Sequence, residues 1–177
     1  MKTVAVFCGS RLGDPIYEES AKRLGECLAA ENITLVYGGG KVGLMGVIAD
    51  SVMANGGTVI GVIPDFLHQR EIAHNHITEL YVVETMHERK KMMADFAEGF
   101  IMIPGGAGTL EEFFEVFTWR QIGLHQKPIG ILNTAGFYEP LRTMLTAMTN
   151  QGFIDTPHLD AAIYEDDPAA LISAMQQ

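Results

Sequence analysis

The sequence predicts an α/β domain in which a doubly wound, mostly parallel, Rossmann-like sheet is flanked by helices. Short apolar runs alternate with longer amphipathic stretches, which is typical of βαβ units because parallel neighbours need long crossover connections. The predicted strands are nearly continuous apolar runs, as expected where helices cover both faces of a sheet. The length of 177 residues fits one domain of roughly 100–200 residues, so residues 1–177 are expected to form a single domain.

Each expected strand is a short run rich in Val, Ile, Leu or Phe that stops at Gly, Pro or a polar residue. The expected strands are Thr3–Cys8, Ile33–Tyr37, Thr58–Ile63, Leu80–Glu84, Phe100–Ile103 and Pro128–Leu132, with Ala161–Tyr164 as a candidate last strand. Between the third and fourth strands, the polar stretch Asp65–His76 is expected to form a long loop.

The expected helices have apolar residues at helical spacing. Pro15 lies near the start of the first, where proline is tolerated. In the third, Met92, Met93 and Phe96 are expected to point inward. The expected helices are Pro15–Glu31, Leu44–Ala54, His87–Glu98, Thr109–Ile122, Phe137–Gln151 and Pro168–Met175.

The net charge and the two cysteines indicate which partners and which cellular compartment to expect. The net charge is −10 with 12 Lys and Arg residues, and a nucleic-acid partner would require a basic face, so none is expected. Cys8 and Cys27 form neither a CxxC pair nor a metal pattern, which favours a reducing, cytoplasmic location. The N-terminal apolar run turns polar at Gly9 and is not interpreted as a signal peptide. No apolar stretch approaches the ~18 residues that span a bilayer, so no membrane partner is expected.

Glycine-rich segments follow three predicted strands, and each precedes a helix. Their candidate ligand-binding residues are Ser10 after the first strand, Gly39, Gly40, Gly43 and Met45 after the second, and Gly105, Gly106, Gly108 and Thr109 after the fifth. If the strands are parallel, the three segments meet at one edge of the sheet, where helix N-termini favour phosphate. Tight turns are the alternative, since no GxGxxG fingerprint follows the first strand and no GxxxxGK[ST] loop is present. The combination favours a phosphate site, such as one for a mononucleotide.

Two charged residues are candidates for chemistry. Arg89 could fork a phosphate or a carboxylate, although the run Glu88–Lys91 also fits a solvated helical face. Glu112 follows Thr109 by three residues, which fits a capping box with Thr109 as the N-cap. The functional alternative places the Glu112 carboxylate beside a bound phosphosugar, with a cation such as Arg89 nearby to balance the two anions.

The sequence offers no sign of a metal or cofactor, and none is expected. The six histidines do not form an HExxH or other metal spacing, and His74 and His76 are expected at the surface of a polar loop. No serine lies in a GxSxG elbow. Met45 and Met86 could form a wall for a base or belong to the core.

Four segments together resemble the Lonely Guy (LOG) family. Residues 104–112, PGGAGTLEE, match its PGGxGTxxE signature, and Met86–Lys90 is similar to its MHxRK segment. Residues 37–46 resemble its YGGGxxGLMG loop, and residues 8–10 its CGS loop. The similarity covers nearly the whole chain, and no departure is seen within the two signatures.

The resemblance implies an N-glycosyl hydrolase, a phosphoribohydrolase that splits a cytokinin riboside 5′-monophosphate or AMP into free base and ribose 5-phosphate. It implies catalytic roles for Arg89 and Glu112. It also implies a homodimer with active sites near the interface. The nucleotide-binding positions that it implies are Ser10, Met86, Lys90, Gly105, Gly106, Gly108 and Thr109.

Three functions remain in competition at this point. A hydrolase would use the Glu112 carboxylate to stabilise positive charge on the sugar and to orient water, with Arg89 as a positioning group. A non-catalytic nucleotide carrier on the same fold would not need that carboxylate. A pyridoxal-phosphate decarboxylase would need a lysine in an apolar setting, and no lysine fits well. The base preference stays open, with Tyr81, Phe114 and Trp119 as possible wall residues.

Overall fold

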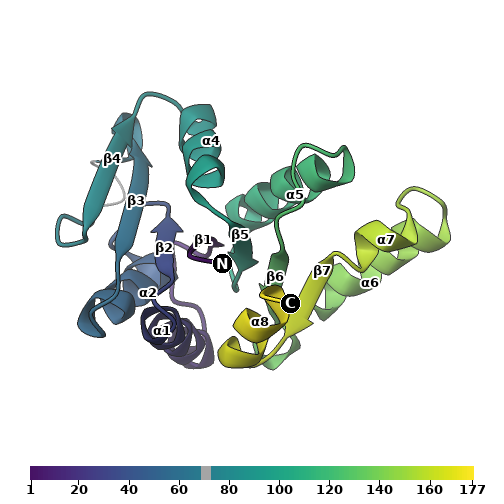
Figure 1. Cartoon of the computed structure of the whole chain (residues 1–177), viewed down its shortest axis with the longest axis horizontal. Helices are drawn as coiled ribbons and strands as arrows, with labels where there is room; N and C mark the ends of the chain where they lie inside the picture. Colours follow the sequence, from purple (N-terminus) through teal and green to yellow (C-terminus); the bar gives the residue numbers. More distant parts are fainter. Residues whose placement is uncertain (69–72) are drawn as a thin grey trace.

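The computed structural model describes residues 1–68 and 73–177 and shows a seven-stranded sheet with helices on both faces (Figure 1). The strand order is β4-β3-β2-β1-β5-β6-β7, and every neighbouring pair is parallel. The strands are β1 (Thr3–Phe7), β2 (Thr34–Tyr37), β3 (Val59–Pro64), β4 (Glu79–Val83), β5 (Gly99–Met102), β6 (Ile129–Leu132) and β7 (Ala162–Glu165). The predicted Rossmann-like class is therefore confirmed, and the sheet is parallel throughout.

The helices cover the sheet in two layers. The helices are α1 (Pro15–Ala30), α2 (Gly43–Ala54), α3 (Asp65–His68), α4 (Met86–Phe96), α5 (Ala107–Gln121), α6 (Glu139–Asn150), α7 (Thr156–Leu159) and α8 (Pro168–Met175), with a 3-10 turn at Thr134–Gly136. In Figure 1, α1, α2 and α8 lie on one side of the sheet and α4 and α5 on the other. Among the described residues, no helix combines the length and the apolar character needed to cross a membrane.

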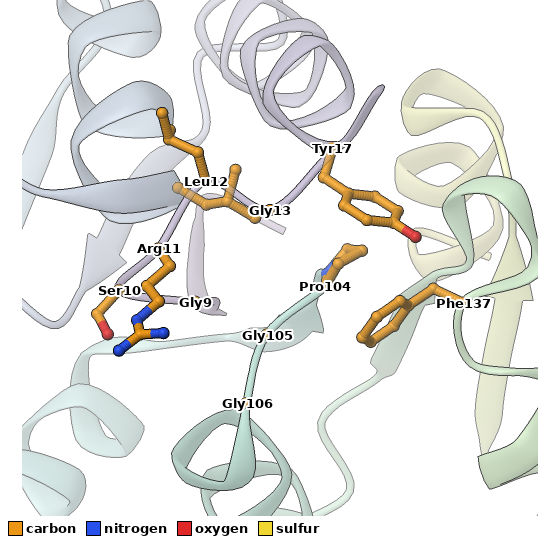
Figure 2. Close-up of a pocket in the computed structure, with 11 residues that line it drawn as sticks. Gly9, Ser10, Arg11, Leu12, Gly13, Tyr17, Pro104, Gly105, Gly106 and Phe137 are labelled. Carbon is orange, nitrogen blue, oxygen red and sulfur yellow. The ribbon is translucent and has the colours of Figure 1, made fainter. Parts of the chain in front are cut away.

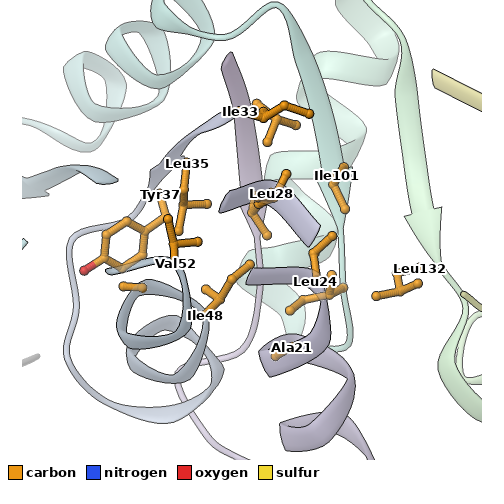
Figure 3. Close-up of a cluster of buried hydrophobic side chains, with 14 of the residues drawn as sticks. Ala21, Leu24, Leu28, Ile33, Leu35, Tyr37, Ile48, Val52, Ile101 and Leu132 are labelled. Carbon is orange, nitrogen blue, oxygen red and sulfur yellow. The ribbon is translucent and has the colours of Figure 1, made fainter. Parts of the chain in front are cut away.

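Alternation along the strands builds a separate core on each face. In β1, Val4 and Val6 pack into the core beneath α1 and α2, whereas Ala5 and Phe7 pack into the core beneath α4 and α5. Figure 3 shows the first core, with side chains from α1 and α2 meeting those of the strands. Successive strand residues point to opposite faces, so two covered faces require apolar residues at nearly every position.

The chain order creates one topological switch point. From β1 the chain moves outward through β2, β3 and β4, and it then returns to place β5 on the other side of β1. In open α/β sheets, the crevice at the carboxyl ends of such strands is where ligands bind. The segments after β1, β2 and β5 are the three glycine-rich segments, so the topology brings them together.

The capping box predicted at Thr109 is wrong. Helix α5 begins at Ala107 with Gly106 as its N-cap, so Thr109 lies inside the first turn and Glu112 in the second. A related interaction occurs at the start of α4, where the Glu88 carboxylate bonds the residue before the N-cap Thr85. There the Thr85 hydroxyl accepts a hydrogen bond from Glu88 N at 3.1 Å, and the Glu88 carboxylate accepts one from Glu84 N at 2.9 Å.

Several local expectations also differ from the structure. Part of the expected loop Asp65–His76 forms the short helix α3, while residues 69–72 of that loop lie outside the described residues. His74 is buried, which contradicts the expected surface position, and its Nε2 atom lies 2.9 Å from the Asp50 carboxylate. Phe96 is 36% exposed and packs against Tyr81. The expected helix from Phe137 starts at Glu139, and α7 was not predicted.

Phe113 tests the core that supports α5. Its side chain is fully buried and stacks on Phe117, so Phe113→Ala should lower the free energy of unfolding by about 3–5 kcal/mol. Phe153→Ala is the matched control, because Phe153 is 84% exposed and its loss should change stability by less than about 0.5 kcal/mol. Urea denaturation measures both variants, and equal effects would contradict the assigned core.

Candidate active site

Hydrogen bonds tie the three glycine-rich segments together at the carboxyl edge of the sheet. Gly9 N, after β1, donates to Pro104 O, after β5, at 3.1 Å. Leu44 N, in the first turn of α2, donates to Gly9 O at 3.1 Å. The segment after β1 therefore lies between the other two, and a ligand at this edge can contact all three.

A cavity of about 330 Å³ opens at this point, and we call it the Arg89 cavity. It brings together predicted site residues from five different elements and loops. Those in its lining are Ser10, Met45, Met86, Arg89, Gly106, Gly108, Thr109 and Glu112. Lining residues that the sequence did not single out for binding are Cys8, Gly9, Leu67, Ala107 and Glu111.

Arg89 is buried at the wall of this cavity, with only 6% of its surface exposed, so the solvated-face alternative is wrong for it. Its Nη2 donates to the carbonyl of Gly38 at 3.0 Å, and its Nη1 lies 3.8 Å from Met86 Sδ. Within the described residues, its Nε atom has no hydrogen-bond partner. Buried guanidinium groups require acceptors, so the Gly38 carbonyl holds this one in place and its hydrogen-bonding capacity is only partly used by the described residues.

Gly38 provides the space that Arg89 occupies. A Cβ atom on residue 38 would overlap the guanidinium group of Arg89. The same glycine therefore supplies both the acceptor carbonyl and the room beside it. The sequence showed Gly38 only as the first member of a glycine run, and nothing local could have linked it to Arg89.

Glu112 lies half-buried in the second turn of α5, facing the Arg89 cavity. The pKa of the nearby Cys8 thiol is shifted by both charged residues. Burial raises the pKa of Cys8 well above its ordinary value, the Glu112 carboxylate raises it further, and the Arg89 guanidinium lowers it. Both charges therefore act on one point of the cavity. Cys8 stays a neutral thiol at physiological pH and forms a wall, not a nucleophile.

The N-terminus of α5 forms the end of the cavity that is best suited to an anion. Gly106, Ala107 and Gly108 are exposed there, and no side chain among the described residues caps this helix. A Cβ atom on Gly106 or Gly108 would have no neighbour within 4 Å in the part of the chain that the structure describes. Unpaired N–H groups at a helix N-terminus favour phosphate, and the glycines let it approach the backbone.

Two other glycines from the predicted site, Gly43 and Gly105, pack against residues of the glycine-rich segments. Gly43 adopts a positive φ of 64° and packs so tightly on Ser10 that a Cβ atom would overlap the Ser10 backbone. Gly105 leaves room for the Thr109 hydroxyl in the same way. Both glycines therefore fix the positions of these loops by close packing.

Gly39, Gly40 and Lys90 lie outside the lining of the Arg89 cavity. Gly39 packs against β3, and Gly40 forms an isolated bridge with Ala73. Lys90 Nζ is 2.6 Å from a Glu111 oxygen and 3.1 Å from a Glu115 oxygen. Burial lowers the pKa of Lys90, but hydrogen bonds to the two carboxylates outweigh it and raise the pKa overall. Lys90 therefore clamps α4 to α5 as a cation.

The three aromatic residues considered as base walls pack elsewhere. Tyr81 packs on Phe96 with ring centroids 5.3 Å apart, and Phe114 packs on Phe113 at 5.2 Å. Trp119 lines a different cavity, between α4 and α5. Among residues 1–68 and 73–177, no group of three or more His, Cys, Asp or Glu side chains could hold a metal ion.

The role of Gly38 can be tested with one added methyl group. Gly38→Ala should displace the Arg89 guanidinium and lower the free energy of unfolding by about 1–3 kcal/mol, as expected for overpacking. A crystal structure and urea denaturation measure the two effects. Gly108→Ala adds the same methyl group in open space and should leave Arg89 in place. An unmoved Arg89 in Gly38→Ala would contradict the assignment.

Comparison with known proteins places the chain in a family. The family model described as possible lysine decarboxylase matches residues 45–175. A cytokinin riboside 5′-monophosphate phosphoribohydrolase of Rhodococcoides fascians is 44% identical over 99% of this chain and 89% of its own length. The LOG7 phosphoribohydrolase of Arabidopsis thaliana is 49% identical over 86% of this chain and 71% of its own. The probable enzyme LOGL2 of Oryza sativa is 44% identical over 99% and 72%.

Solved structures agree on the fold. The molybdenum cofactor carrier protein of Chlamydomonas reinhardtii aligns over 99% of this chain and 96% of its own, with a TM-score of 0.75 and 19% identity. The molybdenum cofactor binding protein of Rippkaea orientalis aligns over 99% and 95%, with a TM-score of 0.74 and 17% identity. At such identities the likeness establishes the fold alone. The sequence relatives go further: this chain belongs to the LOG family, whose members include cytokinin riboside 5′-monophosphate phosphoribohydrolases.

Proposed function

We propose that this chain hydrolyses the N-glycosidic bond of a nucleoside 5′-monophosphate to give free base and ribose 5-phosphate. The substrate is a cytokinin riboside 5′-monophosphate or AMP. The observation that carries the proposal is the pairing of a buried Arg89 with Glu112 in one cavity that ends at an open helix N-terminus. The names of the relatives support the same reaction.

The arrangement suits cleavage between a sugar and a base. The oxygen of a water molecule bonds to C1′ of the ribose, the C1′–N bond breaks, and the base leaves with its electron pair and takes up a proton. Positive charge builds on the sugar during this step, and the Glu112 carboxylate stabilises it and orients the water. A guanidinium group is a poor proton donor, so Arg89 acts by holding the phosphoribose and balancing charge.

The residues also divide the substrate between the two ends of the Arg89 cavity. We place the phosphate at the N-terminal N–H groups of α5, beside Ser10 and Gly106. The apolar side chains of Met45, Leu67 and Met86 line the same cavity and suit the base. With this orientation the C1′ atom lies between them, near Glu112.

Two other functions receive less support. A nucleotide carrier would use the same anion site but has no need of a carboxylate directed at the sugar. The family model's description names a possible lysine decarboxylase, and a decarboxylase that uses pyridoxal phosphate needs a lysine that can lose its proton. Lys90 directly follows Arg89 in the sequence, and its ion pairs with Glu111 and Glu115 keep it protonated.

Glu112 provides the direct test. Glu112→Gln should lower the rate of adenine release from AMP by ~100-fold or more, because the neutral amide neither stabilises the sugar cation nor orients water as a base. HPLC measures the free base, and urea denaturation verifies that the variant is folded. Isopentenyladenosine monophosphate, assayed in parallel, gives the base preference.

Glu111→Gln is the matched control for this experiment. Glu111 precedes Glu112 on α5, but its carboxylate pairs with Lys90 at 2.6 Å, so its loss should change the rate only a few-fold. If neither wild type nor Glu112→Gln releases base while both bind AMP, the carrier function replaces the hydrolase. Equal losses in the two variants would remove the special role of Glu112.

We also propose a cytoplasmic homodimer with one domain per chain. Both cysteines are free, as in a reducing compartment. The apolar side of α5 is mostly used by the core, but Ile122 and Leu124 beyond its end stay 65% and 68% exposed. Exposed apolar side chains of this size are typical of an interface when they cluster.

The dimer proposal predicts a concentration-independent mass of two chains in analytical ultracentrifugation. Replacing both Ile122 and Leu124 with Asp should shift the protein toward the monomer, because the charges would oppose burial. A strict monomer in the wild type would contradict the proposal. Phe153→Asp controls for an exposed apolar residue elsewhere on the surface.

A further inference from the structure

A second cavity, of about 400 Å³, lies at the switch point between β1 and β5 (Figure 2). Its walls are the segment after β1, the segment after β5, Tyr17 from α1 and Phe137 from the segment before α6. We call it the Phe137 cavity. Neither the sequence motifs nor the proposed hydrolysis uses its aromatic residues.

The Phe137 cavity and the Arg89 cavity share a wall. Gly9, Ser10 and Gly106 line both of them. Gly106 is the N-cap of α5, so this wall is the anion-binding end of the Arg89 cavity. In the orientation proposed above, the base lies away from this wall and the phosphate lies against it. The Phe137 cavity is therefore on the far side of the phosphate.

The Phe137 cavity has a cationic side and an aromatic side. In Figure 2, Arg11 and Ser10 lie on one side, and Tyr17 and Phe137 lie on the other. The two rings meet edge to face with their centroids 5.4 Å apart. Phe137 stays 38% exposed and Leu12 43% exposed. Large apolar side chains left open around a hollow indicate a binding surface and contribute little to the core.

These features define the chemistry of an occupant. A guanidinium fork matches the oxygens of a phosphate or diphosphate. The exposed ring of Phe137 matches the face of a second planar group. A diphosphate that begins in the Arg89 cavity can cross the shared wall and carry such a group into the Phe137 cavity.

We infer that the Phe137 cavity is a second nucleoside subsite, which binds the distal nucleoside of a dinucleoside 5′,5′-diphosphate whose first nucleotide occupies the Arg89 cavity. The inference rests on the proposed function for the orientation of that first nucleotide. It extends the ligands of the protein from nucleoside monophosphates to dinucleotides. Arg11 contacts the diphosphate, and Phe137 stacks on the second base.

Two ligands that differ by one nucleoside test the subsite. ADP carries the diphosphate alone, whereas P1,P2-di(adenosine-5′) diphosphate adds a second adenosine. The dinucleotide should bind about tenfold more tightly than ADP, because stacking of a base on an aromatic ring contributes about that factor. Isothermal titration calorimetry measures both affinities without need of catalysis, and inhibition of adenine release from AMP measures them independently.

Variants test whether the difference in affinity between the dinucleotide and ADP depends on the Phe137 cavity. Phe137→Ala should remove the tenfold preference and leave kcat and KM for AMP unchanged, and Leu12→Gln should weaken the preference. Phe153→Ala, an exposed phenylalanine outside both cavities, should keep the preference intact. Thermal unfolding of each variant verifies that Phe137→Ala is folded.

Each outcome decides the inference. Equal affinities for the two ligands in the wild type would overturn it, and so would a preference that survives in Phe137→Ala. If Phe137→Ala instead weakens only isopentenyladenosine monophosphate, the cavity binds the substituent of the first base and the second-nucleoside inference is wrong. If no base is released from AMP but the preference depends on Phe137, the subsite stands and the proposed hydrolase fails.

Discussion

The buried guanidinium of Arg89 is the group on which the candidate site depends. Burying a cation is costly unless hydrogen-bond acceptors replace water. The Gly38 carbonyl supplies one such acceptor at 3.0 Å, and the missing side chain of Gly38 supplies the space. Because Gly38 follows β2 and Arg89 lies on α4, the contact fixes the position of α4 relative to the sheet edge. A protein with a net charge of −10 thereby presents a cation at the wall of the Arg89 cavity.

The opposite charges of Arg89 and Glu112 give the cavity its chemical character. Both charges act on Cys8. Burial has the largest effect and raises its pKa, the Glu112 carboxylate raises the pKa further, and the Arg89 guanidinium lowers it. Glu112 reaches this point because α5 starts at Ala107, which puts residue 112 in the second turn and leaves the first turn open for an anion. A helix that began at Thr109, with Glu112 as its capping partner, would have used the same carboxylate to satisfy its own backbone.

The sequence was sufficient for the fold class and for the grouping of the three loops, because both follow from local periodicity and from the geometry of parallel strands. The sequence-based prediction failed where contacts between residues distant in the sequence determine whether a side chain is buried. His74 lies in a polar segment but is buried against Asp50, and Phe96 has helical spacing but remains partly exposed beside Tyr81. The capping signal at Thr109 was matched by residue type alone. The functioning pair, Thr85 and Glu88, has the same spacing, and only the chain path distinguishes them.

The glycines explain why the location of the site could be predicted from the sequence but the role of each glycine could not. Gly106 and Gly108 leave open space where an anion can approach, whereas Gly38 and Gly105 make room for side chains of this protein. All four look alike in a motif, because the difference lies in neighbours from other elements. Of the two open glycines, Gly106 lines both cavities, together with Gly9 and Ser10. In the orientation that we propose for the substrate, a phosphate at this shared wall is accessible from both cavities, and its distal oxygens face the aromatic side of the Phe137 cavity.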